Sequence, residues 1–488
     1  MGENYGLRSG ENPIKFGTDG WRGRIAADYT FARVAIVAPA AARVLAEVYG
    51  NSGDNRKVLV GYDRRFMAED FARTAAFAIA AAGFEVWLSD SYAPTPAFSW
   101  LANTQKALGA IVITASHNPA GYLGLKVKGA FGGSVGPEIT QRIEALIEEN
   151  PPMGAVDRFP VQTFDPWPAY CEMLRQKVDL AAIRQAISAG KLTVFADVMH
   201  GAAATGLARV LDVPVQEING DRNPLFDGGA PEPLPKYLSR LFREVVRQGR
   251  QQQDALCVGF AFDGDADRIA AVDGQGNFLS SQILIPILIQ HLAQRGGNGG
   301  EVIKTVSGSD LIARVAALYD LPVFETPIGY KYIADRMLQS QVLLGGEESG
   351  GIGYGTHVPE RDALLSALYV LEAIAHSGFD LSEIYADLQA KTGYTFVYDR
   401  IDLPLASMEV RSRLLSQLES SPFSTIAGLV VVDVLAVDGY KFRFADGSWL
   451  LIRFSGTEPV LRLYCEAPTW DQVRHTLAWA RDWANSVV

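Results

Sequence analysis

The chain has 488 residues, 48% of them hydrophobic and 20% charged, which is the composition of a globular protein too long for a single hydrophobic core. Its net charge of −11 argues against broad binding to nucleic acids or anionic membranes. The polar N-terminus has no apolar signal core, no apolar run is long enough to cross a bilayer, and three dispersed cysteines favour a reducing compartment, so we expect a cytoplasmic protein.

Three α/β units are predicted in succession, at residues 1–160, 161–277 and 278–390. In each unit, short aliphatic runs alternate with helical patterns, which is typical of a mostly parallel sheet. Proline-rich residues 150–168 predict a linker between the first two units. Strands are expected at residues 57–62, 84–88, 107–113, 192–197, 213–217, 255–262, 302–306, 323–326 and 342–345, with helices at 68–82, 201–211, 236–250, 281–294, 309–318, 331–339 and 360–377.

Residues 391–488 predict a smaller antiparallel α+β domain. Its strands are short and β-branched, and the pairs Asp438-Gly439 and Asp446-Gly447 are typical hairpin turns. Helices are expected on either side of the strands. The predicted strands cover residues 395–403, 428–437, 440–444, 449–454 and 460–466, and the helices cover 407–418 and 469–486.

The predicted strand at 107–113 ends in Thr114-Ala-Ser-His-Asn-Pro119. Ligands of open α/β sheets collect at the carboxyl ends of strands, so Ser116 is a candidate reactive hydroxyl and His117 a candidate proton carrier. Alone, this segment fits an ordinary turn better, because Ser, Asn and Pro are common turn residues. Its function therefore depends on the motifs elsewhere in the chain.

The second motif is Asp263-Gly-Asp-Ala-Asp-Arg268, directly after the predicted strand at 255–262. Three carboxylates this close repel one another, and a divalent cation relieves that repulsion. Oxygen ligands alone favour Mg²⁺. An EF-hand loop is excluded because its sixth and twelfth positions, which require Gly and Glu, hold Arg268 and Gly274. A solvated acidic turn remains the alternative.

Three further segments suggest anion and hydroxyl binding. Residues 453–457, Arg-Phe-Ser-Gly-Thr, combine a guanidinium, hydroxyls and a glycine that lets backbone amides approach a phosphate, with Arg462 as a further contact. Residues 345–351 place two carboxylates and a hydroxyl on a glycine-rich loop suited to sugar hydroxyls. Residues 15–23 include Arg22 as an anion contact. A loop serine, a cation site and a phosphate-binding segment together suit phosphoryl transfer to a phosphorylated polyol.

These motifs resemble those of the α-D-phosphohexomutases in order and spacing. The matching segments are 114–119, 263–268, 346–350 and 453–457, with 15–23 as a fifth. The resemblance covers the whole chain. It implies an α/β fold of four domains around a central cleft, three α/β domains with mixed sheets and a C-terminal α+β domain.

The resemblance also implies roles for the motif residues. Ser116 would be the phosphoserine, and Mg²⁺ would be bound by its phosphate with Asp263, Asp265 and Asp267. Phosphoryl transfer to a hexose phosphate would give glucose 1,6-bisphosphate, the intermediate and activator, which turns around before Ser116 is rephosphorylated. Further implied roles are the proton carrier for His117 or Lys126; charge balance for Arg22 and Arg268; sugar recognition for Gly329, Tyr330, Lys331, Glu347 and Ser349; and binding of the unreactive phosphate for Arg453, Ser455, Gly456 and Thr457.

One loop departs from part of that family. Members acting on mannose or glucosamine phosphates usually have His where Gly351 stands and Met or Gln where Glu348 stands. We therefore expect interconversion of glucose 1-phosphate and glucose 6-phosphate by a monomer or homodimer. A mannose or dual-specificity mutase is the alternative, and a glucosamine mutase is the third choice.

Two other function classes were considered. The first is a phosphatase with Asp263 and Asp265 as nucleophile and acid, but such enzymes usually have Thr or Val where Asp267 stands. The second is a non-catalytic sugar-phosphate sensor. A reactive serine and metal carboxylates would be superfluous for binding alone, so the sequence favours the mutase over both.

Overall fold

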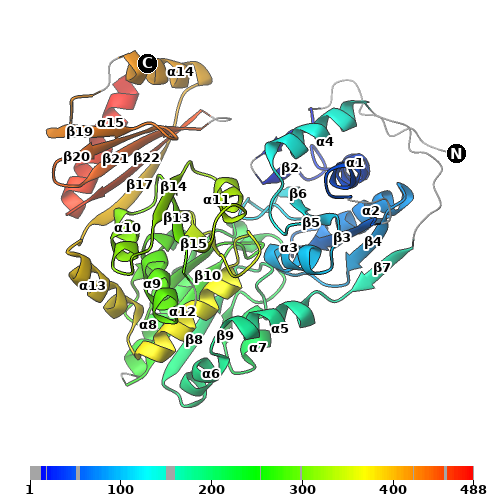
Figure 1. Ribbon diagram of the computed structural model, residues 1–488, viewed down its shortest axis with the longest axis horizontal. Helices are drawn as coiled ribbons and strands as arrows, with labels where there is room; N and C mark the ends of the chain where they lie inside the picture. Colours follow the sequence, from blue (N-terminus) through cyan, green and yellow to red (C-terminus); the bar gives the residue numbers. More distant parts are fainter. Residues whose placement is uncertain are drawn as a thin grey trace.

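The computed structural model describes residues 12–17, 19–50, 55–149, 160–252, 254–296, 299–420, 423–455 and 459–486. These residues form four β-sheets with their helices, which we call domains I to IV in chain order (Figure 1). Domain IV packs at one end of the molecule beside domain III, and domain I lies at the other end. Three domains with mixed sheets and one antiparallel domain confirm the predicted fold class.

Domain I is built on a seven-stranded mixed sheet in the order β1-β2-β6-β5-β3-β4-β7. The residues of β5, Gly-Ala-Ile-Val-Ile, are all buried between two helical layers. One layer is formed by α1, α2 and α4, and α3 covers the opposite face. The strands are β1 Phe16–Gly17, β2 Gly20–Arg24, β3 Lys57–Tyr62, β4 Glu85–Ser89, β5 Gly109–Ile113, β6 Tyr122–Gly129 and β7 Val161–Phe164; the helices are α1 Phe31–Tyr49, α2 Ala68–Ala81, α3 Thr95–Thr104 and α4 Pro137–Glu149.

The predicted linker at 150–168 is wrong in its second half. Residues 161–164 form β7, which pairs in parallel with β4 and completes the first sheet. The polar sequence of β7 hides this role, because an edge strand buries few side chains. Residues 150–159 lie outside the described part of the chain.

Domain II has a five-stranded sheet in the order β12-β11-β10-β8-β9. The parallel pair β8 and β10 lies at its centre, and β10 carries the acidic motif at its carboxyl end. The helix predicted at 201–211 begins only at Gly206, and the strand predicted at 213–217 lies at 216–218. The elements are β8 Leu192–Asp197, β9 Gln216–Ile218, β10 Leu256–Phe262, β11 Ile269–Asp273, β12 Phe278–Leu279, α5 Trp167–Lys177, α6 Leu180–Ser188, α7 Gly206–Leu211 and α8 Ser239–Gln251.

Domain III has a four-stranded sheet in the order β14-β13-β15-β16. Its first three strands are parallel, and β16 turns back beside β15 after the glycine-rich loop. Every residue of α12 from 363 to 374 is buried, so this helix lies inside the molecule. The elements are β13 Glu301–Thr305, β14 Val323–Thr326, β15 Val342–Gly346, β16 Ile352–Tyr354, α9 Ser281–Gln294, α10 Asp310–Ala317, α11 Tyr330–Met337, α12 Ala363–Ser377 and α13 Leu381–Thr392.

Domain IV has a six-stranded sheet in the order β17-β22-β21-β20-β19-β18, antiparallel throughout as predicted. The helices α14 and α15 cover one face of it. The elements are β17 Val397–Pro404, β18 Thr425–Ile426, β19 Leu429–Leu435, β20 Tyr440–Phe444, β21 Trp449–Phe454, β22 Val460–Ala467, α14 Met408–Ser420 and α15 Trp470–Ser486.

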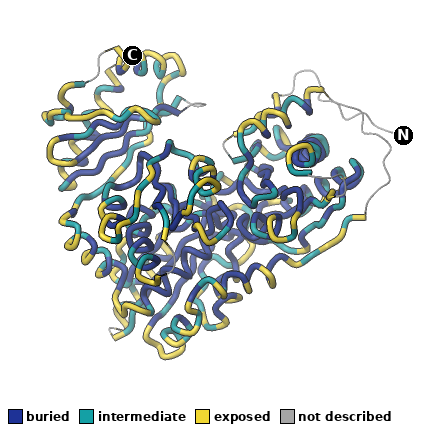
Figure 2. Tube along the Cα trace, viewed as in Figure 1, coloured by how far each residue is buried: buried dark blue, intermediate teal, exposed yellow. Residues whose placement is uncertain are grey.

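Buried residues run through all four domains (Figure 2). One buried cluster runs from α3 of domain I through β8 and β10 of domain II to α9 and α12 of domain III. Domain IV has its own core. Within the described residues, no single helix is long and apolar enough to cross a membrane, although the bent pair α12 and α13 together reaches that length and composition.

Candidate active site

A cleft of about 1180 Å³ is lined by residues of all four domains. It lies where loops leave the carboxyl ends of β5, β10 and β15, the position expected for a ligand site in parallel sheets. The end of β21 brings the predicted phosphate-binding segment to the same cleft. Its lining residues include Asp19, Arg22, His117, Arg268, Gly329, Tyr330, Lys331, Glu347, Ser349, Arg361, Arg400, Arg453 and Arg462.

The loop after β5 holds Ser116 in a fixed, buried position. Ser116 has a positive φ of 52° and is 1% exposed. Its backbone N–H donates to Thr114 Oγ1 at 2.9 Å, and its carbonyl accepts from Arg65 Nη2 at 2.5 Å. The side-chain Oγ donates to Asp263 Oδ2 at 2.9 Å and lies 3.3 Å from Nδ1 of His117. The serine loop and the acidic motif therefore meet directly.

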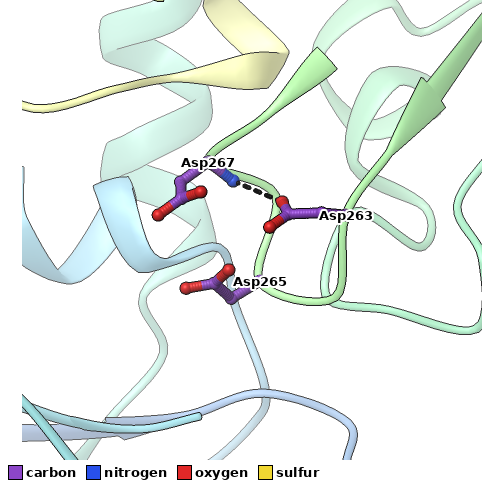
Figure 3. Close-up of side chains that lie close together, drawn as sticks. All are labelled: Asp263, Asp265 and Asp267. Carbon is purple, nitrogen blue, oxygen red and sulfur yellow. Dashed lines mark hydrogen bonds between the residues drawn. The ribbon is translucent and has the colours of Figure 1, made fainter. Parts of the chain in front are cut away.

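The three aspartates of the acidic motif form one buried cluster (Figure 3). Their ligand oxygens lie within 4.8 Å of one another, and all three side chains are fully buried. Burial, followed by Asp267 and Asp265, raises the pKa of Asp263 well above its ordinary value. Among the described residues, Asp265 Oδ1 and Asp267 Oδ1 have no hydrogen-bond partner. Buried, unpaired carboxylate oxygens with no nitrogen or sulfur ligand fit Mg²⁺.

Lys126, on β6, fills part of the space beside this cluster. Its ammonium lies 2.8 Å from Asp265 Oδ2, 2.8 Å from Asp267 Oδ2 and 2.7 Å from Asp19 Oδ2. Burial lowers the pKa of Lys126, but the three carboxylates outweigh burial and raise it above its ordinary value. Lys126 therefore holds its proton in this arrangement and cannot accept another.

His117 has the opposite electrostatic environment. Burial, followed by the charges of Arg268 and Arg22, lowers its pKa well below the ordinary value. The imidazole is therefore neutral at neutral pH, and burial and the two neighbouring cations oppose its protonation. Arg22, on β2, donates to Asn118 Oδ1 at 2.7 Å, which ties this cation to the loop that carries His117.

The sugar-loop candidates differ in how they meet the cleft. Glu347 is 7% exposed, and burial raises its pKa. Gly329 has a φ of 134° directly before α11, a backbone conformation that favours glycine. The Tyr330 ring is largely buried, and its hydroxyl donates to Met337 Sδ at 3.7 Å, so it contributes mainly to the core of domain III. Lys331 lies with its ammonium 4.8 Å from the Tyr332 ring.

The predicted phosphate-binding segment is described only in part. Arg453 lines the cleft and donates from Nε to Asp438 Oδ2 at 2.9 Å. Ser455 is buried, and its backbone N–H donates to the carbonyl of Val460 at 3.0 Å. Gly456 and Thr457 lie outside the described residues. Guanidinium groups thus stand at both ends of the cleft, Arg22 and Arg268 near Ser116 and Arg453 and Arg462 in domain IV.

Two residues of the site, Asp19 and Arg361, are not predicted from the sequence. Asp19 accepts charge-assisted contacts from Lys126, Lys128 and Arg361, and Arg361 also contacts Asp267. Asp19 lies in segment 15–23, where only Arg22 was singled out. Arg361 stands in a charged run, Glu-Arg-Asp, immediately before the apolar helix α12. The signal that could have identified Arg361 is this group of charged residues directly before a helix that is otherwise apolar.

Comparison with known proteins gives consistent matches along the chain. Four domain descriptions of the phosphoglucomutase/phosphomannomutase family match residues 13–152, 168–276, 280–392 and 422–479, being α/β/α domains I, II and III and the C-terminal domain. Together they cover most of the four sheets, and only β7, β12 and β17 lie between the matched ranges. The match thus extends over the same loops that meet in the cleft.

Individual relatives carry different substrate names. A probable phosphoglucosamine mutase of Methanothermobacter thermautotrophicus is 29% identical over 98% of this chain and 99% of its own. A phosphoglucosamine/phosphogalactosamine mutase of Sulfurisphaera tokodaii is 30% identical, covering 93% and 95%. A phosphoglucomutase/phosphomannomutase of Thermococcus kodakarensis is 28% identical, covering 86% and 88%.

Solved structures share the whole architecture. A putative phosphomannomutase from Thermus thermophilus is 34% identical, with a TM-score of 0.83 over 97% of this chain and 100% of that one. A Paramecium phosphoglucomutase, 21% identical, has the same fold with a TM-score of 0.81 over 98% and 95%. The chain belongs to the phosphoglucomutase/phosphomannomutase family of the α-D-phosphohexomutase superfamily, whose enzymes are isomerases.

Proposed function

We propose that the protein is a phosphoglucomutase that interconverts glucose 1-phosphate and glucose 6-phosphate through a phosphoserine at Ser116. The observation that carries this proposal is the 2.9 Å contact between Ser116 Oγ and Asp263 Oδ2, inside a buried carboxylate cluster. A serine that only forms part of a turn does not require a cluster of carboxylates beside it. A serine that carries a phosphoryl group needs a cation beside it.

In the first half-reaction, the bond between phosphorus and the Ser116 oxygen breaks and a bond from phosphorus to a sugar hydroxyl oxygen forms; the hydroxyl loses a proton and the Ser116 oxygen gains one. In the second half-reaction, the other phosphoryl group of the bisphosphate leaves its sugar oxygen and bonds to the Ser116 oxygen; Ser116 loses its proton and the sugar oxygen gains one. The position of His117, 3.3 Å from Ser116 Oγ, supports a role in exchanging the serine proton. Lys126 is paired with three carboxylates and balances their charge. The sequence left these two residues as alternatives, and the contact with Ser116 favours His117.

Mg²⁺ would be held by Asp263, Asp265, Asp267 and the phosphate on Ser116, and it would neutralise charge on the transferred group. A mutase of the same fold from Aspergillus fumigatus, 14% identical, was solved with magnesium and with glucose 1,6-bisphosphate. We infer that the same bisphosphate is the intermediate and activator here. Arg453 and Ser455, with Gly456 and Thr457, would bind its unreactive phosphate, since the guanidinium of Arg453 already lines the cleft.

The sugar loop supports a neutral sugar as substrate. Glucosamine carries an ammonium, which an unpaired carboxylate would bind well. Glu348 is already paired through both oxygens with Arg400 at 3.0 Å, so this carboxylate is not free for an ammonium group. Glucose phosphates are therefore proposed ahead of glucosamine phosphates, with mannose phosphates as the second choice.

Intact mass spectrometry of the purified protein tests the chemistry. A fraction should be heavier by about 80 Da, one phosphoryl group on a serine. Ser116→Ala should lack this species and lose nearly all mutase activity. The proposal fails if Ser116→Ala keeps its activity while Asp263→Ala loses it, since that result favours an aspartate nucleophile. Values of kcat/KM for glucose, mannose and glucosamine phosphates decide the substrate, and a preference for either of the last two would overturn glucose.

A further inference from the structure

Among the described arginines, Arg361 alone forms ion pairs with carboxylates of domains I, II and III together. It lies at the start of α12 in domain III and is 5% exposed. Its Nη2 is 2.7 Å from Asp19 Oδ2 of domain I and 2.7 Å from Asp267 Oδ2 of domain II. Its Nη1 is 3.9 Å from Glu347 Oε2 on the sugar loop. One cation therefore joins the metal carboxylates to the sugar loop.

The stem of Arg361 occupies the space next to Gly351. A Cβ added at Gly351 would lie 2.3 Å from Arg361 Cδ and 2.9 Å from Arg361 Cγ, far closer than atoms can approach. Gly351 is not among the glycines with positive φ, so its backbone does not itself require glycine. Glycine is required at this position because the space for a side chain is occupied by Arg361, and any side chain there would push Arg361 away from its carboxylates.

The charge of Arg361 is fixed. A guanidinium stays protonated at all working pH values, so this residue cannot serve as a base. It can only position groups and balance charge. Asp267 is also held by Lys126 at 2.8 Å, so the contact that Arg361 adds is the link from this carboxylate to Glu347 on the sugar loop.

We propose that Arg361 is a positioning residue that fixes the sugar-loop carboxylate Glu347 relative to the metal carboxylate Asp267, and that Gly351 is kept small to admit it. This proposal rests on the mutase function proposed above. Because one guanidinium contacts both carboxylates, a sugar held by Glu347 is placed at a set distance from the phosphoryl group. Misplacement of reacting groups by about 1 Å can cost on the order of 100-fold in rate.

A double-mutant cycle tests this arrangement. Arg361→Ala removes the cation, and Gly351→Ala displaces it while every charge stays in the chain. Each single variant should lower kcat/KM by about 100-fold. The value of kcat/KM for the double variant should lie within about threefold of the value for the less active single variant, because both substitutions remove the same contact. Arg361→Lys should recover part of kcat. Gly299→Ala, at a glycine with open space, is the matched control and should not change kcat/KM.

Binding of Mn²⁺ to the metal-free protein gives a second readout that needs no turnover. Removing the positive charge of Arg361 beside Asp267 should tighten Mn²⁺ binding by about tenfold or more in Arg361→Ala, because a divalent cation is repelled about twice as strongly as a unit charge. Arg361→Lys should bind Mn²⁺ like the parent protein. Tighter metal binding together with slower turnover distinguishes positioning from general damage, which would weaken both.

Several results would overturn the proposal. They are weaker or unchanged Mn²⁺ binding in Arg361→Ala, or losses in kcat/KM that multiply in the double variant. If the parent protein interconverts no hexose phosphate, the proposed function fails, while the Mn²⁺ titrations still decide the role of Arg361. Gly351→Ala and Arg361→Lys keep the charge balance of the buried cluster, so they can be measured even if Arg361→Ala does not fold.

Discussion

Lys441 is a buried lysine at the contact between domains IV and III. Its ammonium donates to the carbonyl of Val306 at 2.9 Å and lies 4.0 Å from the Trp449 ring centre. Burial, followed by the charge of Lys304, lowers the pKa of Lys441 to about 7. In the unfolded chain a lysine keeps its proton up to about pH 10. Between these two pH values, unfolding takes up a proton.

The stability of the protein should therefore depend on pH through Lys441. The folded form excludes the proton between pH 7 and about 10, so the free energy of unfolding should rise with pH there by up to about 1.4 kcal/mol per unit. Lys441→Met removes this slope. Its advantage over the parent protein should be largest at pH 7 and shrink towards about pH 10. Urea unfolding at several pH values measures it.

The exposed Lys191 provides the control. Lys191→Met should leave the pH dependence of unfolding as it is in the parent protein, since this side chain lies on the surface. Parallel stability curves for the parent protein and Lys441→Met would contradict the lowered pKa of Lys441.

At the scale of single residues, the sequence predicted the candidate site well where chemistry is local. Asp263, Asp265 and Asp267 occupy consecutive alternate positions, so their meeting needs no knowledge of the fold. Arg361 could not be found in this way. Its contacts to Asp19 and Asp267 join positions far apart in the chain, and only the packing of three domains brings them together.

The scale of secondary structure is illustrated by the start of α12. Asp362 precedes the helix and accepts the backbone N–H of Leu365 at 2.9 Å, which caps the helix. The same carboxylate accepts the hydroxyl of Tyr170, in α5 of domain II, at 2.9 Å. Asp362 is fully buried, so one side chain satisfies a helix terminus and a buried hydroxyl from another domain.

Asp362→Ala should be strongly destabilising. The lost cap costs about 1 kcal/mol and the unpaired, buried Tyr170 hydroxyl about 1 to 3 kcal/mol, so we expect a loss of about 2 to 4 kcal/mol in the free energy of unfolding. Urea unfolding at neutral pH measures this loss. In a Tyr170→Phe background the same substitution should cost less, because no hydroxyl is left unpaired. Equal costs in both backgrounds would contradict the shared role of Asp362.

Most elements were predicted because burial follows a simple period along the chain. The predictions for α9, β14 and β20 agree with the structure to the residue. The antiparallel members of the mixed sheets were missed, among them β6 and β11. A parallel α/β pattern expects a helix after each strand. The strands β6 and β11 instead follow directly after the functional loops, with no helix before them, so the expected alternation of strand and helix did not predict them.

At the scale of the whole molecule, domains II and III share one continuous buried cluster, which also takes in α3 of domain I. Most of the buried residues of domain I and of domain IV form cores of their own, and a small cluster around Val306 and Trp449 joins domain IV to domain III. Four units are predicted from the sequence, but nothing in it indicates which of them share a core. That depends on side chains meeting between domains, which no periodicity along one segment reports.

An ion pair crosses the cleft between domain IV and the sugar loop. Arg400, on β17, donates to both carboxylate oxygens of Glu348 at 3.0 Å. The two side chains are partly exposed, at 28% and 14%. This contact holds the domain that carries Arg453 against the loop that carries Glu347. The pair thus preorganises the cleft for a ligand that contacts both domain IV and the sugar loop.

Glu348→Ala and Arg400→Ala should therefore weaken substrate binding more than chemistry. We expect KM for the sugar phosphate to rise by about tenfold and kcat to change by less than about threefold, because ordering of domain IV would then be part of binding. The double variant should resemble either single variant, since both remove one contact. The exposed pair Lys391 and Asp387 on α13 is the matched control, and its removal should leave KM unchanged. A fall in kcat with an unchanged KM would show that the pair acts on the reaction itself.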